Sequence, residues 1–193
     1  MNFNDYKKYK WFFTSSGKLV VGGKSAEQND ELLRKIKKFW KELYIMHTTS
    51  PGSPFCAIIS DLADVSVKDL EECAIFTGCF SRGWKEMKRK TEVHIFKLSQ
   101  LKKDKKMKDG TWSIKGEVNK MTVELKLALI KQGGVYRAVP VKTVGSAANI
   151  LKVCPGEEDK TKMADKIIKK LKDKNVSKNE LLAALPAGGV EIC

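Results

Sequence analysis

The first third of the chain alternates between short apolar runs and a longer apolar pattern with helical spacing. Residues 9–22 contain two runs rich in aromatic and β-branched residues, which predict a β-hairpin with its turn at residues 16–17. Apolar residues then recur at helical spacing over residues 32–43 and predict a helix. Ser25 is the expected N-cap of this helix, and Gln28 completes a capping-box pattern.

The next third has the same mixed character. Residues 44–48 and 54–60 predict a second pair of strands on either side of a loop. Ser66 is the expected cap of a second helix, whose apolar stripe runs over residues 67–87. A further strand is predicted over residues 91–98.

After a lysine-rich turn, residues 111–115 are expected to rejoin the sheet. Residues 121–131 alternate between apolar and polar positions, a period of two that predicts one long strand. The turn at residues 132–134 leads into a partner strand over residues 135–141, and Pro140 indicates that this partner lies at a sheet edge.

The pattern changes again after residue 145. Residues 163–171 carry an apolar stripe, and Ser177, with a glutamate three residues later, begins a short helix that ends at Leu185. We therefore predict an α+β fold, with a mainly antiparallel sheet, helices on one face, and a short C-terminal helical appendage. The expected division is a core over residues 1–145 and an appendage over residues 146–193, either packed on the core or docking a partner.

The net charge of the chain and its distribution narrow the classes of function that the sequence can support. The chain has 37 Lys and Arg against 23 Asp and Glu, a net charge of +14. Residues 82–120 hold 13 of the basic and five of the acidic residues, a net of +8. Such a concentration favours a patch for a polyanion, because neutralising phosphates releases counterions. The alternative is a lysine-rich solvated loop.

Enzymatic chemistry has little support in the sequence. No C-x-x-C pair, phosphate-loop motif or local nucleophile signature is present, so we expect no metal site, no cofactor and no catalysis. No secretory signal or membrane span is recognisable, and a cytoplasmic protein with reduced thiols and no membrane partner is expected. The five scattered cysteines are Cys56, Cys73, Cys79, Cys154 and Cys193.

Two local groups are candidates for binding phosphate. The turn of Gly22, Gly23 and Lys24 leads directly into a helix start, where free N–H groups and the helix dipole favour an anion. An ordinary glycine turn explains the same residues equally well. The second group is the basic helix end formed by Arg82, Lys85, Lys88 and Arg89, beside Trp84, for which core packing is the favoured role.

Several segments together resemble the NFACT-R family, the RNA-binding module of ribosome quality-control factors of the RqcH/NEMF type. The hairpin and helix start over residues 11–30 and the CAIFTGCFSRGWKE segment over residues 73–86 carry most of the resemblance. The HTTSPGSPF loop over residues 47–55 and the TWSIKGEVN segment over residues 111–119 add to it. The tail over residues 155–189 is similar to the ending of short, stand-alone members.

The resemblance implies RNA binding and association with translation, through tRNA, rRNA or the large ribosomal subunit. It also implies a set of contact residues from three segments, to which the basic helix end adds two. These are Gly22, Gly23, Lys24, Gln28, Asn29, His47, Ser50, Ser53, Ser81, Arg82, Trp84, Lys85, Lys88 and Arg89. For Gln28, Asn29, Ser81 and Arg82, the alternative is a buried polar network that stabilises the fold.

Three functional hypotheses follow. The first is a non-catalytic RNA-binding module associated with translation. The second is an accessory subunit or enzyme of RNA modification that uses His47 or a cysteine. The third is a protein–protein adaptor that docks its partner through residues 155–193.

Overall fold

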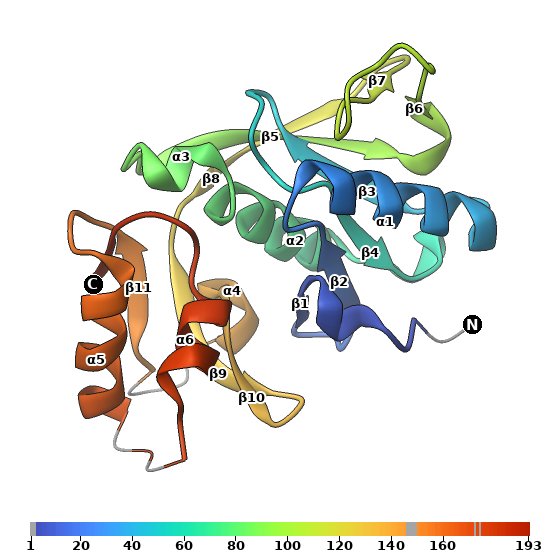
Figure 1. The fold of residues 1–193 in the computed structure, drawn as a ribbon. Helices are drawn as coiled ribbons and strands as arrows, with labels where there is room; N and C mark the ends of the chain where they lie inside the picture. Colours follow the sequence, from blue (N-terminus) through green and yellow to red (C-terminus); the bar gives the residue numbers. More distant parts are fainter. Residues whose placement is uncertain (1–2, 146–149, 172, 174) are drawn as a thin grey trace.

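A computed structural model describes residues 3–145, 150–171, 173 and 175–193 (Figure 1). Its larger sheet has six strands in the order β1-β2-β4-β3-β5-β8, and every neighbouring pair is antiparallel. The α+β class and the antiparallel sheet are thus confirmed. The six strands are β1 (Lys10–Phe13), β2 (Leu19–Gly22), β3 (Tyr44–Thr48), β4 (Cys56–Ile59), β5 (Lys90–Lys97) and β8 (Asn119–Glu124).

The two long helices cover opposite faces of this sheet. Helix α1 (Ala26–Phe39) shares a core with Trp11, whereas α2 (Val67–Cys79) shares another with Phe12, the next residue along β1. Consecutive strand residues point to opposite faces, so both faces are buried. The prediction of helices on one face is therefore corrected. Consecutive apolar residues, such as the three aromatic residues Trp11, Phe12 and Phe13 of β1, are the local sign of such a doubly covered sheet.

A second, four-stranded sheet follows in the order β10-β9-β11-β12 (Figure 1, lower left). The single strand predicted over residues 121–131 is divided between the two sheets. The break falls at Leu125 and Lys126, whose N–H groups donate to Arg89 and Glu124 carbonyls. The apolar alternation continues through the break, so periodicity did not reveal it. The four strands are β9 (Leu127–Gln132), β10 (Val135–Pro140), β11 (Lys152–Pro155) and β12 (Val190–Ile192).

The C-terminal region contains the two expected helices, α5 (Lys160–Leu171) and α6 (Lys178–Ala184). It also contains β11 and β12, which the sequence analysis missed because each strand is very short. β11 pairs with β9, and Pro140 lies on the edge strand β10, as predicted. The division at residue 145 stays a prediction, and residues 146–149 lie outside the described part of the chain.

The helix predicted through residue 87 ends at Cys79. Ser81 interrupts it, because its hydroxyl donates to the Gly78 carbonyl and accepts the Gly83 N–H, which begins the short helix α3. Residues 111–115 likewise pair only within a separate two-stranded sheet. The remaining elements are α3 (Arg82–Lys85), α4 (Val141–Val144), β6 (Leu101–Lys102), β7 (Ser113–Ile114), and the 3-10 turns η1 (Tyr6–Lys8), η2 (Leu62–Asp64) and η3 (Leu98–Gln100).

Ser25, Ser66 and Ser177 cap their helices as predicted. The capping box at Ser25 is wrong in one respect, because the Gln28 side chain accepts the N–H of Lys24. At Ser177 the glutamate side chain accepts from the backbone of Tyr136 and thereby ties α6 to the second sheet.

The expectation of five reduced thiols is corrected. Cys154 and Cys193 form a disulfide that joins β11 to the residue after β12. The other three cysteines are free and buried. Among the described residues, no helix combines the length and the apolar character that crossing a membrane requires.

Buried carboxylates hold the first hairpin turn against α2. Asp69, only 1% exposed, accepts hydrogen bonds of 2.6 Å from the hydroxyls of Thr14 and Ser16. Glu72, fully buried, accepts from the backbone and side chain of Ser15. Burial raises the pKa of Asp69, but the hydrogen bonds from Ser16, Ser66 and Thr14 outweigh it and lower the pKa to about 2.

We predict that Asp69→Asn lowers the free energy of unfolding by about 2 kcal/mol at pH 7. The pKa of Asp69 in the folded protein lies below its ordinary value of 3.8. The stabilisation by the ionised carboxylate is therefore complete above about pH 4 and is lost as the pH falls through 2. Urea unfolding of the variant and the wild type from pH 7 to pH 2 measures it, with Asp64→Asn as an exposed control. A difference that stays constant with pH would contradict the assignment.

Candidate nucleic-acid interface

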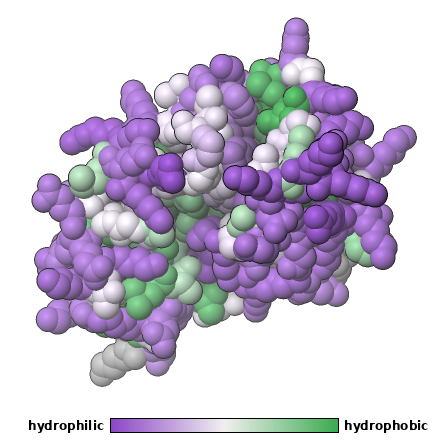
Figure 2. All heavy atoms as spheres, turned by 45° about the horizontal axis from the view of Figure 1, so that its top comes forward, coloured by the Kyte–Doolittle hydropathy of each residue, from purple (hydrophilic) through white to green (hydrophobic). Residues whose placement is uncertain are grey.

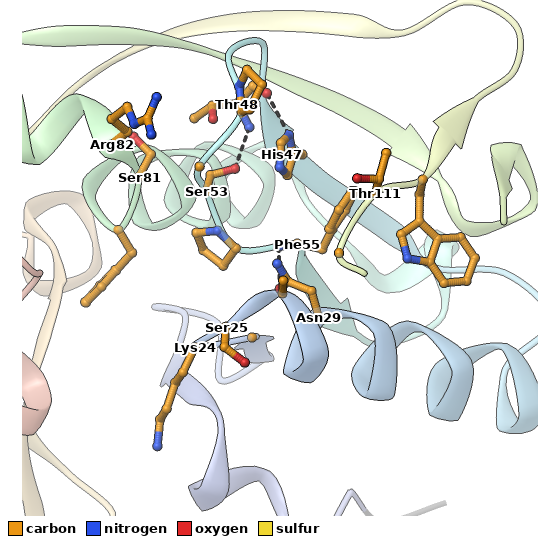
Figure 3. A pocket seen from close by; sticks show the side chains of 18 of the residues that line it. Lys24, Ser25, Asn29, His47, Thr48, Ser53, Phe55, Ser81, Arg82 and Thr111 are labelled. Carbon is orange, nitrogen blue, oxygen red and sulfur yellow. Dashed lines mark hydrogen bonds between the residues drawn. The ribbon is translucent and has the colours of Figure 1, made fainter. Parts of the chain in front are cut away.

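A cleft of about 670 Å³ opens where four segments meet. These are the start of α1, the loop between β3 and β4, the start of α3 and the turn before β7 (Figure 3). Eight of the fourteen predicted site residues line it, although they come from three separate segments of the sequence. They are Gly23, Lys24, Asn29, His47, Ser53, Ser81, Arg82 and Lys85.

Asn29 connects the start of α1 to the β3–β4 loop. Asn29 is 7% exposed, and its Oδ1 accepts the backbone N–H of Phe55 at 3.1 Å (Figure 3). Gly23 allows this close approach, because a Cβ there would lie 2.7 Å from the backbone nitrogen of Asn29. Asn29 therefore belongs to the polar network that was the alternative to RNA contact. Gln28 is also engaged, as the acceptor for the N–H of Lys24.

The β3–β4 loop is held by its own hydroxyls. The buried Ser53 accepts the N–H of Thr48 at 3.0 Å, and the Thr48 hydroxyl donates to the Ser50 carbonyl at 2.7 Å. The N–H of Arg82 donates to the Gly52 carbonyl at 2.8 Å, which attaches the loop to α3. Ser53 thus shapes the cleft, and Ser50 lines a smaller neighbouring cavity of about 210 Å³.

The basic end of α3 divides into buried and exposed residues. Trp84 is fully buried, and its Nε1 donates to the Gly189 carbonyl at 2.9 Å, so it packs in the core as the sequence favoured. Ser81 is the buried cap. Arg82 and Lys85 are exposed on the cleft wall, and Lys88 and Arg89 are exposed just beyond it, so all four cations are accessible to solvent.

His47 presents a neutral acceptor to the cleft. Its Nδ1 lies 2.7 Å from the Thr48 carbonyl, which can only accept, so Nδ1 carries the proton. Burial lowers the pKa of His47, which keeps the ring neutral at pH 7 and leaves Nε2 unprotonated. The ring also stacks on Phe55 at 4.4 Å between centroids.

A lysine-rich segment closes one side of the cleft, and an aspartate that sequence analysis did not single out holds it there. Asp30, 2% exposed, forms an ion pair with Lys103 at 2.9 Å and accepts from Trp112 Nε1 at 2.7 Å. Gly110 has a positive φ, and a Cβ there would meet the Cβ of Ala26 at 2.7 Å. Trp112 is therefore half-buried against α1, and Trp11 is buried in the core.

Lys10 is a further cleft residue that the sequence did not indicate. Its Nζ lies 4.3 Å from the centre of the Phe80 ring. Burial, with the repulsion of Lys160 and Arg137, lowers the pKa of Lys10 to about 8. Its position in a short apolar strand carries no local sign of this environment.

The molecular surface suits a polar partner. Figure 2 shows hydrophilic side chains over most of the visible face, and apolar residues reach this face in small separate patches. A large apolar patch is typical of protein-docking surfaces, whereas projecting cations are typical of nucleic-acid binding.

A family model described as the NFACT protein RNA binding domain matches residues 8–116, which is more than half of the chain. The chain belongs to the NFACT-R family. The matched segment contains all fourteen predicted site residues and the cleft wall from Lys10 to Ile114. The NFACT-R cleft is thus formed almost entirely by the part of the chain that defines the family.

Two individual proteins are similar to this NFACT-R chain. The archaeal Rqc2 homolog aRqcH of Methanocaldococcus jannaschii is 28% identical over 197 aligned residues, which cover 97% of this chain and 29% of that protein. The chain therefore spans less than a third of that relative. The C-terminal structure of the fibronectin/fibrinogen-binding protein from Streptococcus suis is 21% identical, with a TM-score of 0.53 over 64% of this chain and 48% of that one, a likeness of fold.

We predict that Asn29→Ala lowers the free energy of unfolding by about 1–3 kcal/mol, because it leaves the buried N–H of Phe55 without its acceptor. Urea unfolding measures the change. Lys24→Ala, five residues away and exposed, is the matched control and is expected to change stability by less than about 0.5 kcal/mol. Equal stability of the two variants would contradict the structural role of Asn29 and would favour a role in RNA contact.

We also predict that Lys10→Met raises the free energy of unfolding by about 1–3 kcal/mol at pH 7, because it removes a partly buried cation and keeps the apolar contact with Phe80. Between pH 8 and the ordinary pKa of 10.5, the unfolded chain binds more protons at this position. The wild type therefore gains stability as the pH rises, and the advantage of the variant disappears near pH 10.5. Urea unfolding of the wild type and the variant at pH 7 and pH 10.5 tests both the stability gain at pH 7 and its disappearance at pH 10.5. The exposed Lys7→Met is the control.

Proposed function

We propose that this chain is an RNA-binding module of ribosome-associated quality control and that RNA lies along the cleft. The family supplies RNA binding as the general function, and the role in quality control follows from the similarity to aRqcH. The observation that carries the proposal is the convergence in one cleft of exposed cations, the start of a long helix and a neutral histidine acceptor.

Each of these groups suits a different part of a nucleotide. Arg82 and Lys85 supply charge for phosphates, with Lys88 and Arg89 extending the same surface. The start of α1 presents the positive end of its dipole, although the N–H of Gln28 is already taken by the hydroxyl of Ser25. The unprotonated Nε2 of His47 accepts a hydrogen bond from a base amino group or a 2′-hydroxyl.

Catalysis by a cysteine has no support from the environment of the three free thiols. Burial raises the pKa of Cys56 to about 12 and that of Cys73 and Cys79 further, so none supplies a thiolate at neutral pH. Any role in RNA modification thus depends on His47 or on a partner enzyme.

The adaptor hypothesis has less support than RNA binding. The apolar stripe of the C-terminal helices is occupied within the chain, because Met163 and Ile167 of α5 and Leu181 of α6 are buried in the core beside β9 and β10. Docking through this region would need a surface other than that stripe.

The test is binding to tRNA, to a single-stranded RNA and to ribosomal subunits across a salt series. We predict that the variant with Arg82, Lys85, Lys88 and Arg89 all changed to Ala binds at least about tenfold more weakly at 150 mM salt. The slope of log affinity against log salt is expected to fall by about 2–3 units, because fewer phosphates are neutralised.

A variant with four exposed lysines changed elsewhere controls for net charge. Lys38, Lys41, Lys169 and Lys170 lie outside the cleft and outside the basic end of α3. An equal loss of RNA affinity in both variants would show that the effect comes from the overall charge of the protein. Absence of binding in the wild type would reject the proposed function.

A further inference from the structure

Two histidines from neighbouring strands lie side by side in the cleft. His47 belongs to β3 and His94 to β5, and the two are direct partners in the antiparallel register. Such partners point to the same face of a sheet, with Cβ atoms about 5 Å apart. Both side chains line the cleft, and they are the only histidines of the chain. The strand pairing thus brings together two rings that are distant in the sequence.

The ring of His47 leaves one nitrogen free for a ligand. Its Nδ1–H donates to the Thr48 carbonyl at 2.7 Å (Figure 3), and its Nε2 has no hydrogen-bond partner among the described residues. No nitrogen is among the buried side-chain atoms that lack a partner in this part of the chain, so this Nε2 is reached by solvent. His47 therefore offers an accessible acceptor.

The ring of His94 is held through its other nitrogen. Its Nε2 lies 3.0 Å from the Thr49 hydroxyl oxygen, which lies 2.7 Å from a carboxylate oxygen of Glu92. Hydrogen bonds from Thr49 and Lys120 lower the pKa of Glu92, so this carboxylate is ionised at neutral pH and can only accept.

These contacts settle where the protons lie. The Thr49 hydroxyl donates its one proton to Glu92 and therefore accepts from Nε2–H of His94. In the neutral ring of His94, Nδ1 is then the acceptor. It has no partner among the described residues and is also not a buried atom. The two rings use opposite nitrogens to reach the same result, an accessible acceptor on each strand.

The protein groups beside the rings use their own hydrogens within the fold. The Thr48 hydroxyl donates to the Ser50 carbonyl at 2.7 Å, and the Thr49 hydroxyl donates to Glu92. The backbone N–H of Thr49 donates to the Glu92 carbonyl at 3.1 Å. These neighbours leave no hydrogen for a ligand, so the histidine pair presents acceptors.

An exocyclic amino group is the part of a nucleotide that fits two neighbouring acceptors. It has two hydrogens, and the acceptors that they reach lie about 5 Å apart when each hydrogen bond has its usual length. Adenine, cytosine and guanine carry such a group, whereas uracil carries a carbonyl oxygen where cytosine has its amino group. A carbonyl beside two acceptors loses its hydrogen bonds with water and gains none from the rings.

We propose that His47 and His94 form a base-selective site that binds an RNA base with an exocyclic amino group and discriminates against uracil. The site rests on the proposed function for the RNA that enters the cleft, and it assigns the base amino group, in place of the 2′-hydroxyl, to His47. The exposed cations of the cleft wall bind phosphates without regard to sequence. Selection of the base is therefore measured separately from overall affinity.

The experiment compares the binding of oligo(C) and oligo(U) of equal length at neutral pH. The two RNAs carry the same number of phosphates on pyrimidines of the same size. The wild type is expected to bind oligo(C) at least about fivefold more tightly. His94→Phe keeps a ring but removes the acceptor, and it is expected to reduce the ratio of the two affinities to below about twofold. Lys90→Gln, exposed on the same strand and outside the cleft, is the control and keeps the wild-type ratio.

Thr49 tests the orientation of the His94 ring. Thr49→Val removes the oxygen that accepts from Nε2–H, and it is expected to lower the ratio of the two affinities. Thr49→Ser keeps the hydroxyl and is expected to restore the ratio. A purely structural role of Thr49 would change the stability of the protein and leave the ratio unaltered.

Equal affinity of the wild type for oligo(C) and oligo(U) overturns the site and leaves RNA binding intact. Equal affinity for these two RNAs with weaker binding of oligo(dC) would assign the ring acceptors to the 2′-hydroxyl instead. A wild-type ratio that survives in His94→Phe also overturns the site.

Nitrogen-15 NMR of the two histidine rings separates this site from the proposed function. A shift of the unprotonated ring nitrogens on adding cytidine, and none on adding uridine, supports the site even where neither oligonucleotide binds. Unchanged ring nitrogens with cytidine count against it. The same spectra check the two tautomers directly, and protonated Nε2 in His47 would contradict the arrangement.

Discussion

The hydrogen bond from the Phe55 N–H to Asn29 Oδ1 sets the geometry on which the cleft depends. It joins the start of α1 to the β3–β4 loop, and that loop is joined in turn to α3 through the Gly52 carbonyl and the N–H of Arg82. Gly23 permits the first contact because any side chain there would collide with Asn29. Three segments far apart in sequence are thus held by neutral hydrogen bonds, which persist at any salt concentration, while Arg82 and Lys85 on the cleft wall stay exposed to solvent.

This arrangement divides the candidate residues by chemistry. The neutral polar groups, such as Asn29, Ser53 and Ser81, are buried and form hydrogen bonds within the protein. The charged groups, such as Arg82 and Lys85, face solvent. RNA binding and a buried polar network were alternatives for the same residues in the sequence. The structure places the buried neutral residues in the network, whereas contact of the exposed cations with RNA stays a proposal. A protein that binds a polyanion gains from this division, because its scaffold is insensitive to the ions that weaken its contacts.

Local signals predicted the local structure well. Hairpin turns, serine caps and apolar periodicity identified most helices and strands, because each depends on residues within one or two turns of one another. The failures are long-range. The alternation through Leu125 and Lys126 does not reveal that the chain changes sheets there, and β11 and β12 are too short to show a period. Whether α1 and α2 share a face depends on packing, although the consecutive buried residues Trp11 and Phe12 did carry that information. The resemblance over several segments named eight of the residues that line the cleft, whereas Lys10, which also lines it, belongs to no motif.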